Sequence, residues 1–282
     1  MAQVFLLWYR KFMRWWVGIF CGASSLLSAF VIGNPGQPAF ASKSILLPTS
    51  KKVSFRLGYL DDYVYSQHFG EMNFRSDAFF PPAVDNFNEK PPVAKLSTNA
   101  AILTVNFLRK IDVYGIAGVS QFQMDEDVYT KQRFAWGVGT KWVIYTWDKF
   151  RVGCDFKYFQ TEPSLTFLSF SGLPLDPLSK LVLEYTEWQG AAGFSYQSEW
   201  ICPYLTASYL IATMTPKPGG AFLVKIPGRV EPGDAEIKLV TNRNRWGAAV
   251  GATLLLGRKG ILALESRFIN QNAINATLEL RF

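Results

Sequence analysis

Charged side chains are scarce in this chain of 282 residues: Asp, Glu, Lys and Arg make up 18% of it, against roughly 25% in ordinary soluble domains. Histidine occurs once and cysteine three times. No Cys or His stands at the spacing of metal ligands, so no metal is expected. We expect no organic cofactor either. No cluster of Lys and Arg is interleaved with aromatic residues, which argues against nucleic acid as a partner.

Long hydrophobic runs are also lacking, except for one near the N-terminus. That run extends from Trp15 to Ile32, follows three basic residues and precedes Ala39-Phe40-Ala41. Basic residues, an apolar stretch and a small-x-small site are the three parts of a secretory signal peptide. We therefore expect a signal peptide over residues 1–41 and a single domain over residues 42–282. The alternative is a membrane anchor that stays attached.

An exported chain without a second spanning run is either periplasmic or an outer-membrane barrel, whose strands carry only about ten alternating residues each. Such alternation is frequent here. In the stretch 246–254, apolar residues at even positions alternate with Gly, Ala and Thr at odd positions. A soluble sandwich would place Lys and Glu on its polar face, whereas small residues and scattered charges suit the interior of a small barrel.

Short and long connections between the segments alternate along the chain. Residues 109–110, 147–149, 199–200 and 257–259 form tight joins, and Pro, Gly, Asp and Asn fill the long ones; only the join at 270–271 is short where a long loop is expected. The sequence thus predicts an all-β fold, a transmembrane antiparallel up-and-down barrel of about ten strands (ten to twelve), with short periplasmic turns and long extracellular loops. The strands are expected near 52–60, 97–108, 111–121, 133–146, 150–160, 184–198, 201–213, 243–256, 260–269 and 272–282.

The last predicted strand ends on an aromatic residue with apolar residues at every second position behind it. The outer-membrane insertion machinery favours terminal strands of this kind. We expect Phe282, Leu280 and Leu278 to form an assembly signal.

Strand parity also assigns charged side chains to the barrel interior. A porin needs no catalytic residue, because its selectivity comes from the charges that line the constriction. Both signs occur, so solutes would be screened by size more than by charge; alternatively, the charges pair across the lumen and plug it. The pore-lining candidates are Arg56, Lys141, Asp155, Lys157, Glu187, Glu265, Arg267, Glu279 and Arg281.

Two cysteines follow the expected signal peptide, Cys154 and Cys202. Export permits a disulfide between them or between chains. Both lie in strand-like segments, so two unpaired thiols that face the membrane are equally compatible with the sequence.

Several stretches resemble the chlamydial major outer membrane protein, a porin family. Residues 184–189, EYTEWQ, with the GAAGFSYQSEWICPYLTASYLIA that follows, are similar to a late strand pair of that family, and RWGAAVGATLLLGRKGILALESRFINQNAINATLELRF is similar to its C-terminal end. The resemblance implies a trimeric general-diffusion porin that also strengthens the envelope through cysteine cross-links. The family barrel is larger and richer in cysteine, so this chain would be a shortened or divergent member.

Taken together, the residues and the resemblance predict a multi-pass porin of the outer membrane of a Gram-negative-type bacterium. It would let ions and small hydrophilic solutes diffuse passively and contribute to envelope structure. The expected partners are outer-membrane lipid, lipopolysaccharide, the barrel-assembly machinery and, from the resemblance, further copies in a homotrimer.

Two other classes of function remain open at this point. One is a non-conducting structural or adhesive barrel. The other is an outer-membrane enzyme, which would need a base near a nucleophile or paired carboxylates. The candidates are His68, expected in a loop, and the acidic stretches Asp61-Asp62 and Asp125-Glu126-Asp127, which are alternatively sites for a divalent cation.

Overall fold

The structure is a computed structural model, and it describes residues 33–40, 53–70, 74–76, 93–124, 128–170, 173–177, 182–217, 221–226, 229–237, 240–257 and 260–282. Among these residues, no helix combines the length and the hydropathy needed to cross a bilayer. The apolar run from Trp15 to Ile32, expected to belong to a signal peptide or an anchor, lies outside the described residues.

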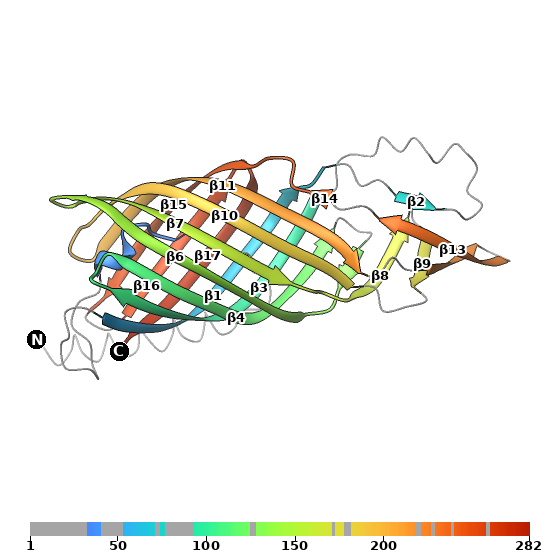
Figure 1. The fold of residues 1–282 in the computed structure, drawn as a ribbon, viewed down its shortest axis with the longest axis horizontal. Helices are drawn as coiled ribbons and strands as arrows, with labels where there is room; N and C mark the ends of the chain where they lie inside the picture. The colour runs from blue at the N-terminus through green and yellow to red at the C-terminus, as the bar shows by residue number, and fades with distance from the viewer. Residues whose placement is uncertain are drawn as a thin grey trace, which may run out of the picture.

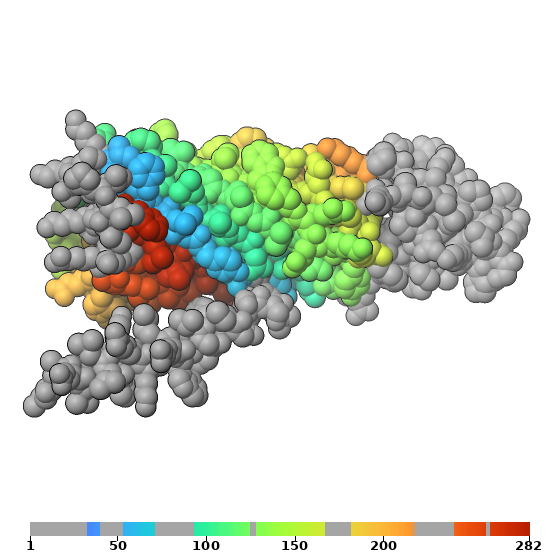
Figure 2. Space-filling model, turned by 90° about the horizontal axis from the view of Figure 1, so that it is seen from below, coloured from blue at the N-terminus to red at the C-terminus, as the bar shows by residue number. Residues whose placement is uncertain are grey.

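Ten long strands form a closed antiparallel barrel (Figure 1). Each strand pairs with the next long strand along the chain, and the last pairs back with the first, which removes the sheet edges. At this seam Tyr59 lies opposite both Leu278 and Ala101, and Figure 2 shows the blue first strand beside the red C-terminal ones. The predicted ten-stranded up-and-down barrel is confirmed. Its strands are β1 (Val53–His68), β3 (Val93–Phe107), β4 (Ile111–Met124), β6 (Arg133–Trp147), β7 (Phe150–Thr161), β10 (Val182–Tyr196), β11 (Ile201–Lys217), β15 (Trp246–Leu256), β16 (Gly260–Phe268) and β17 (Gln271–Arg281).

The two faces of each strand meet different surroundings. Along β17, buried and more exposed residues alternate with a period of two. Its outward side chains are apolar, with Ile274, Leu278 and Leu280 between 43% and 51% exposed. Apolar residues on the outside and polar ones on the inside are the pattern of a barrel surrounded by lipid.

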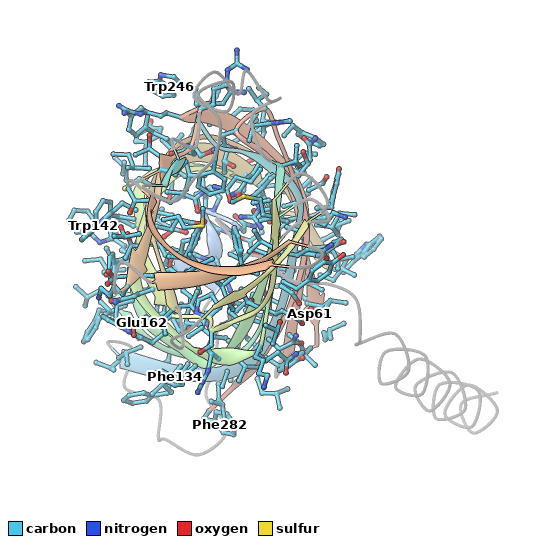
Figure 3. All side chains as sticks on the ribbon, turned by 90° about the vertical axis from the view of Figure 1, so that its right-hand side faces the viewer. Asp61, Phe134, Trp142, Glu162, Trp246 and Phe282 are labelled. Carbon is cyan, nitrogen blue, oxygen red and sulfur yellow. The ribbon has the colours of Figure 1, made fainter. Side chains whose placement is uncertain are left out.

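Aromatic side chains also cover the outer wall. Figure 3 shows Phe134, Trp142 and Trp246 pointing away from the barrel, and all three are exposed. Trp147 and Trp200, next to tight turns, are exposed as well. Large aromatic side chains near strand ends are typical of the interfacial girdles of outer-membrane barrels.

Tight turns gather at one end of the barrel, which we call the short-turn rim. Leu108 and Arg109, between β3 and β4, have φ angles of 54° and 57°. Positive φ at both central residues is the geometry that matches the twist of a two-residue hairpin. The opposite end is the long-loop rim, where β16 and β17 are nevertheless joined by Ile269 and Asn270 alone. The predicted exception near 270–271 is therefore confirmed.

Strands extend further toward the long-loop rim than the sequence predicted. β1 was expected to end near residue 60, but it continues to His68, which pairs with Val93 of β3. Asp61 and Asp62 are therefore strand residues and not the base of a loop. The acidic pair suggested a loop, but Asp62 faces the barrel interior and meets Arg267 there, so the strand accommodates it.

The long connections, expected to be loops, carry short strands of their own. Five antiparallel pairings join β5 to β8, β8 to β9, β9 to β12, β12 to β13, and β13 to β2. They lie beyond the long-loop rim, at the right of Figure 1. The short strands are β2 (Phe74–Ser76), β5 (Val128–Thr130), β8 (Leu165–Phe170), β9 (Leu173–Pro177), β12 (Ala221–Ile226), β13 (Arg229–Ile237) and β14 (Val240–Thr241).

The segment Gly33–Phe40 lies inside the barrel at the short-turn rim. It ends in a single 3-10 turn, η1 (Gln37–Phe40), drawn in blue in Figure 1. Residues 33–38 are all buried. We call Gly33–Phe40 the lumenal segment. The expectation that a signal peptide ends at Ala41 stays a prediction, and it would remove this segment from the mature protein.

Two tyrosine side chains brace the interior in the same way. The ring of Tyr204 on β11 lies over Gly251 of β15, and its hydroxyl donates to the Glu265 carboxylate of β16 over 2.9 Å. Tyr114 on β4 repeats the arrangement over Gly139 of β6. In each case the glycine leaves room for a ring that a Cβ would meet at 2.3 Å. Each tyrosine thereby spans three adjacent strands.

We predict that Gly251→Ala destabilises the barrel, because the new methyl group overlaps the Tyr204 ring. Overpacking of this kind costs about 1–3 kcal/mol, measured as a shift of the urea unfolding midpoint in detergent. Gly115→Ala is the matched control, since a Cβ there meets nothing within 4 Å. Equal midpoints for the two variants would contradict the bracing role of Tyr204.

Candidate functional site in the barrel interior

The charged residues assigned to the interior by parity are all buried there. The most exposed, Lys141, has a relative exposure of 7%, and Arg267 and Glu187 have 1% each. Their role in lining a pore stays a prediction, but their placement inside the barrel follows from contacts with one another and with far strands. The nine side chains are Arg56, Lys141, Asp155, Lys157, Glu187, Glu265, Arg267, Glu279 and Arg281.

Arg56 is the centre of an ion-pair cluster near the short-turn rim. Its Nε donates to Oε2 of Glu279 over 2.6 Å, and its Nη2 donates to Asp112. Asn106 donates from Nδ2 to the other carboxylate oxygen of Asp112 over 2.6 Å. The guanidinium has donors in several directions, so one arginine can join acids from two strands.

A second cluster lies closer to the middle of the barrel. Arg267 of β16 donates to Asp62 of β1, and its Nε is 3.7 Å from Glu265. Lys157 of β7 is 3.0 Å from the Glu187 carboxylate of β10. Because these pairs are nearly excluded from water, the attraction between the partners must compensate for the hydration that each charge has lost.

Polar neutral groups complete the two clusters. The Lys157 ammonium also donates to Oε1 of Gln189 over 2.8 Å, and the Tyr185 hydroxyl donates to Glu187 over 2.8 Å. The Tyr114 hydroxyl donates to Asp155 over 2.9 Å, while the Lys141 ammonium lies 5.4 Å from the centre of the Tyr114 ring. We call these buried ion pairs and their hydrogen-bonding partners together the charge network.

Apolar side chains fill the interior between the charge network and the long-loop rim. The rings of Phe122 and Phe159 pack on Tyr185, with centroid distances of 6.3 Å and 6.2 Å. Phe69 and Leu96 are buried in the same cluster. Within the described residues, an interior cavity of about 20 Å³ remains, next to Lys141, which is room for about one water molecule. As far as the described residues show, the lumen is packed with side chains rather than open.

The interior charges nearly cancel. Charges of opposite sign that lie this close attract one another strongly, so they pair with each other and attract few mobile counter-ions. The buried basic residues are Arg56, Lys141, Lys157, Arg267 and Arg281, and the buried acidic ones are Asp62, Asp112, Asp155, Glu187, Glu265 and Glu279.

The two cysteines lie on opposite faces of the barrel wall and both are free. Cys202 of β11 is fully buried on the inward parity, whereas Cys154 of β7 has the outward parity between Val152 and Phe156. A disulfide within one chain would have to cross the wall. The geometry therefore does not support that pairing, and of the two thiols only Cys154 faces the membrane.

The residues considered for an enzyme do not form a catalytic arrangement in the described chain. His68 is exposed at the end of β1, with Nε2 3.5 Å from the Ser66 hydroxyl. Asp62 is buried against Arg267, whereas the neighbouring Asp61 has the opposite parity. The stretch 125–127 lies outside the described residues.

Several members of the charge network were not predicted from the sequence. Asp62 was assigned to a loop, and Asp112 directly follows a turn, so neither was counted as inward. The tyrosine partners Tyr114, Tyr185 and Tyr204 were not among the candidates. Asp112 has the same parity as Tyr114 in β4, and that signal was available in the sequence.

We predict that Lys157→Met destabilises the folded barrel by about 3–5 kcal/mol, because it leaves Glu187 charged and buried without its cation. The double variant Lys157→Met/Glu187→Gln should recover most of that loss. Lys217→Met is the control: Lys217 pairs with Glu184 over 2.9 Å but is 51% exposed, so no measurable change is expected. Unfolding titrations of the four proteins measure the effect, and equal losses for the single and double variants would contradict the pairing.

Comparisons with known proteins relate the chain to outer-membrane porins of chlamydiae. No family model matches the chain. The major outer membrane porin of Chlamydia trachomatis serovar D is 21% identical over an alignment that covers 92% of this chain and 96% of that protein. The Chlamydia abortus porin is 22% identical, with 93% and 96% covered, and a Chlamydia pneumoniae porin is 21% identical, with 93% and 97% covered. The alignments exceed the length of this chain, so the relatives carry additional residues between the matched segments.

Solved outer-membrane barrel structures superpose only loosely on this chain. The translocator domain of the autotransporter NalP from Neisseria meningitidis has a TM-score of 0.42 and 10% identity, with 84% of this chain and 89% of that one covered. The Pseudomonas aeruginosa outer membrane protein OprG has a TM-score of 0.39 and 8% identity, with 82% and 97% covered. Scores this low carry no argument about function. The chain is an outer-membrane β-barrel of a Gram-negative-type bacterium and a distant homologue of the chlamydial major outer membrane porins.

Proposed function

We propose that this barrel is a porin-type channel of narrow bore, through which ions and small hydrophilic solutes pass by diffusion. The observation that carries the proposal is the charge network. A barrel that served only as a scaffold could fill its middle with hydrocarbon side chains. This one places Arg56, Lys157 and Arg267 there with their acidic partners, although burying such pairs is costly.

The distant homology supports the same function. The relatives that match nearly the full chain are named as porins, and porin-like outer-membrane barrels are generally not enzymes. Lipid of the outer membrane is the barrel's surroundings. The assembly machinery, lipopolysaccharide and a homotrimer remain expected partners, as does a contribution to envelope structure.

The packed interior determines what kind of channel is proposed. Among the residues that the structure describes, the lumenal segment and the cluster around Tyr185 fill the interior with buried side chains. Conduction therefore requires side chains or the lumenal segment to move, so we expect brief openings of small conductance. Because the interior charges nearly cancel, the channel should discriminate weakly between cations and anions.

A non-conducting structural barrel is the second candidate, and a specific observation favours it. The apolar cluster of Phe69, Phe122 and Phe159 closes the interior on the side of the long-loop rim. If this cluster never opens, the charge network serves only to hold the strands together.

A planar lipid bilayer distinguishes the two candidates. The refolded chain should give discrete openings under a salt gradient, with a reversal potential close to zero. A folded, heat-modifiable barrel that leaves the bilayer silent would contradict the channel and favour the structural barrel.

We predict that Lys141→Gln shifts the reversal potential toward cation selectivity, because it removes a positive charge from the lumen while Glu279 and Asp155 remain. Lys149→Gln is the matched control, since Lys149 lies exposed in the turn between β6 and β7. Equal shifts for both variants would show that the interior charges do not face the ion path.

A further inference from the structure

The lumenal segment Gly33–Phe40 is bound to the inner wall by contacts from most of the barrel. Its residues Asn34 and Gln37 have relative exposures of 0% and 2%. Its hydrogen bonds and closest contacts reach residues of β3, β6, β7, β10, β11, β15, β16 and β17. A segment held from eight of ten strands occupies the cross-section of the barrel rather than one side of it.

Asn34 fixes the first half of the segment. Its Nδ2 donates to Oγ1 of Thr253 over 3.1 Å and to the Cys202 carbonyl over 3.4 Å. Its Oδ1 accepts from the backbone N–H of Gly36 over 2.8 Å, which turns the chain within the lumen. The backbone N–H of Gly33 donates to Oε2 of Glu265 over 2.8 Å. All polar atoms of the Asn34 side chain are thus used.

Gln37 fixes the second half by sitting between opposite charges. Its Nε2 donates to Oε1 of Glu279 over 2.6 Å, and its Oε1 accepts from the Lys141 ammonium over 3.2 Å. Asn106 donates from Nδ2 to the Pro38 carbonyl over 3.0 Å. An amide offers both a donor and an acceptor, so glutamine matches this pair of charges without adding a charge of its own.

The fit between segment and wall is close at two glycines. A Cβ added at Gly36 would lie 2.2 Å from the Ser195 hydroxyl oxygen, and one added at Gly153 would lie 2.5 Å from the Pro35 carbonyl oxygen. Pro35 and Pro38 restrict the backbone before it binds, which lowers the conformational entropy that docking loses. Wall and segment are therefore complementary in shape as well as in hydrogen bonding.

We propose that the short-turn rim of the lumen is a peptide-binding site whose occupant is this chain's own segment Gly33–Phe40, retained in the mature protein as a plug. Retention requires that the signal peptide is cut upstream of Gly33, which excludes cleavage after Ala41. Binding of the plug does not depend on conduction. Its further role, to close the channel, rests on the function proposed above.

The N-terminus of the protein purified from outer membranes tests retention directly. Intact-mass and N-terminal peptide measurements should show a mature chain that still contains Gly33–Phe40. A mature chain that begins at Ser42 would overturn the proposal, whatever the bilayer recordings show.

Conductance of the full chain tests closure. We predict that Asn34→Ala/Gln37→Ala raises the open probability about tenfold, the factor that corresponds to ~1.4 kcal/mol of lost plug binding. Lys149→Gln is the control, because Lys149 lies exposed in the turn between β6 and β7 and outside the lumenal segment. The control should conduct like the wild type.

The possible failures of the two proposals are distinguishable. If the double variant and the wild type open equally often, closure by the plug is wrong while the channel stands. If every protein is silent, the channel is wrong, and the N-terminal measurement still decides retention. Adding the peptide GNPGQPAF to the double variant should restore the low open probability, and no effect would count against the binding site.

Discussion

The interior of this ten-stranded barrel must be filled by inward-facing side chains and by the lumenal segment, and the rest of the structure depends on that constraint. A barrel of this size encloses a space that side chains can occupy completely. Every inward polar group then loses water and needs a partner within the lumen. The exterior poses no such problem, because apolar side chains such as Leu278 and Trp142 meet lipid there.

Three layers satisfy this constraint along the barrel axis. Near the short-turn rim, the lumenal segment supplies the amides of Asn34 and Gln37. In the middle, acids and bases from distant strands neutralise one another. Toward the long-loop rim, the rings around Tyr185 exclude water. The outer layers support the middle one. The lumenal segment donates hydrogen bonds to Glu265 and Glu279, and the aromatic layer shields the pair of Lys157 and Glu187 from water.

Much of the barrel follows from periodicity in the sequence, because the wall separates lipid from lumen with a strict period of two. That separation is why ten strands, the turns and the inward position of residues such as Arg56 and Lys157 were predictable. The pairs of side chains that meet across the lumen were not predictable from the sequence. Arg267 and Asp62 are 205 residues apart in sequence, and their meeting depends on the tilt and stagger of the strands, which alternation does not encode. The position of the lumenal segment inside the barrel was not predictable either, because its small and proline-rich residues resemble the end of a signal peptide.

The most direct test of this account is the accessibility of Cys202, a native thiol that lies fully buried in the lumen beside the lumenal segment. The folded full-length barrel would be treated with a small, charged, water-soluble thiol reagent, and peptide mass spectrometry would separate modification of Cys202 from that of Cys154. A filled, plugged lumen predicts that Cys202 stays unmodified until the barrel is unfolded or Asn34 and Gln37 are replaced. Rapid modification of Cys202 in the folded wild-type protein would contradict it and show an open lumen at the short-turn rim.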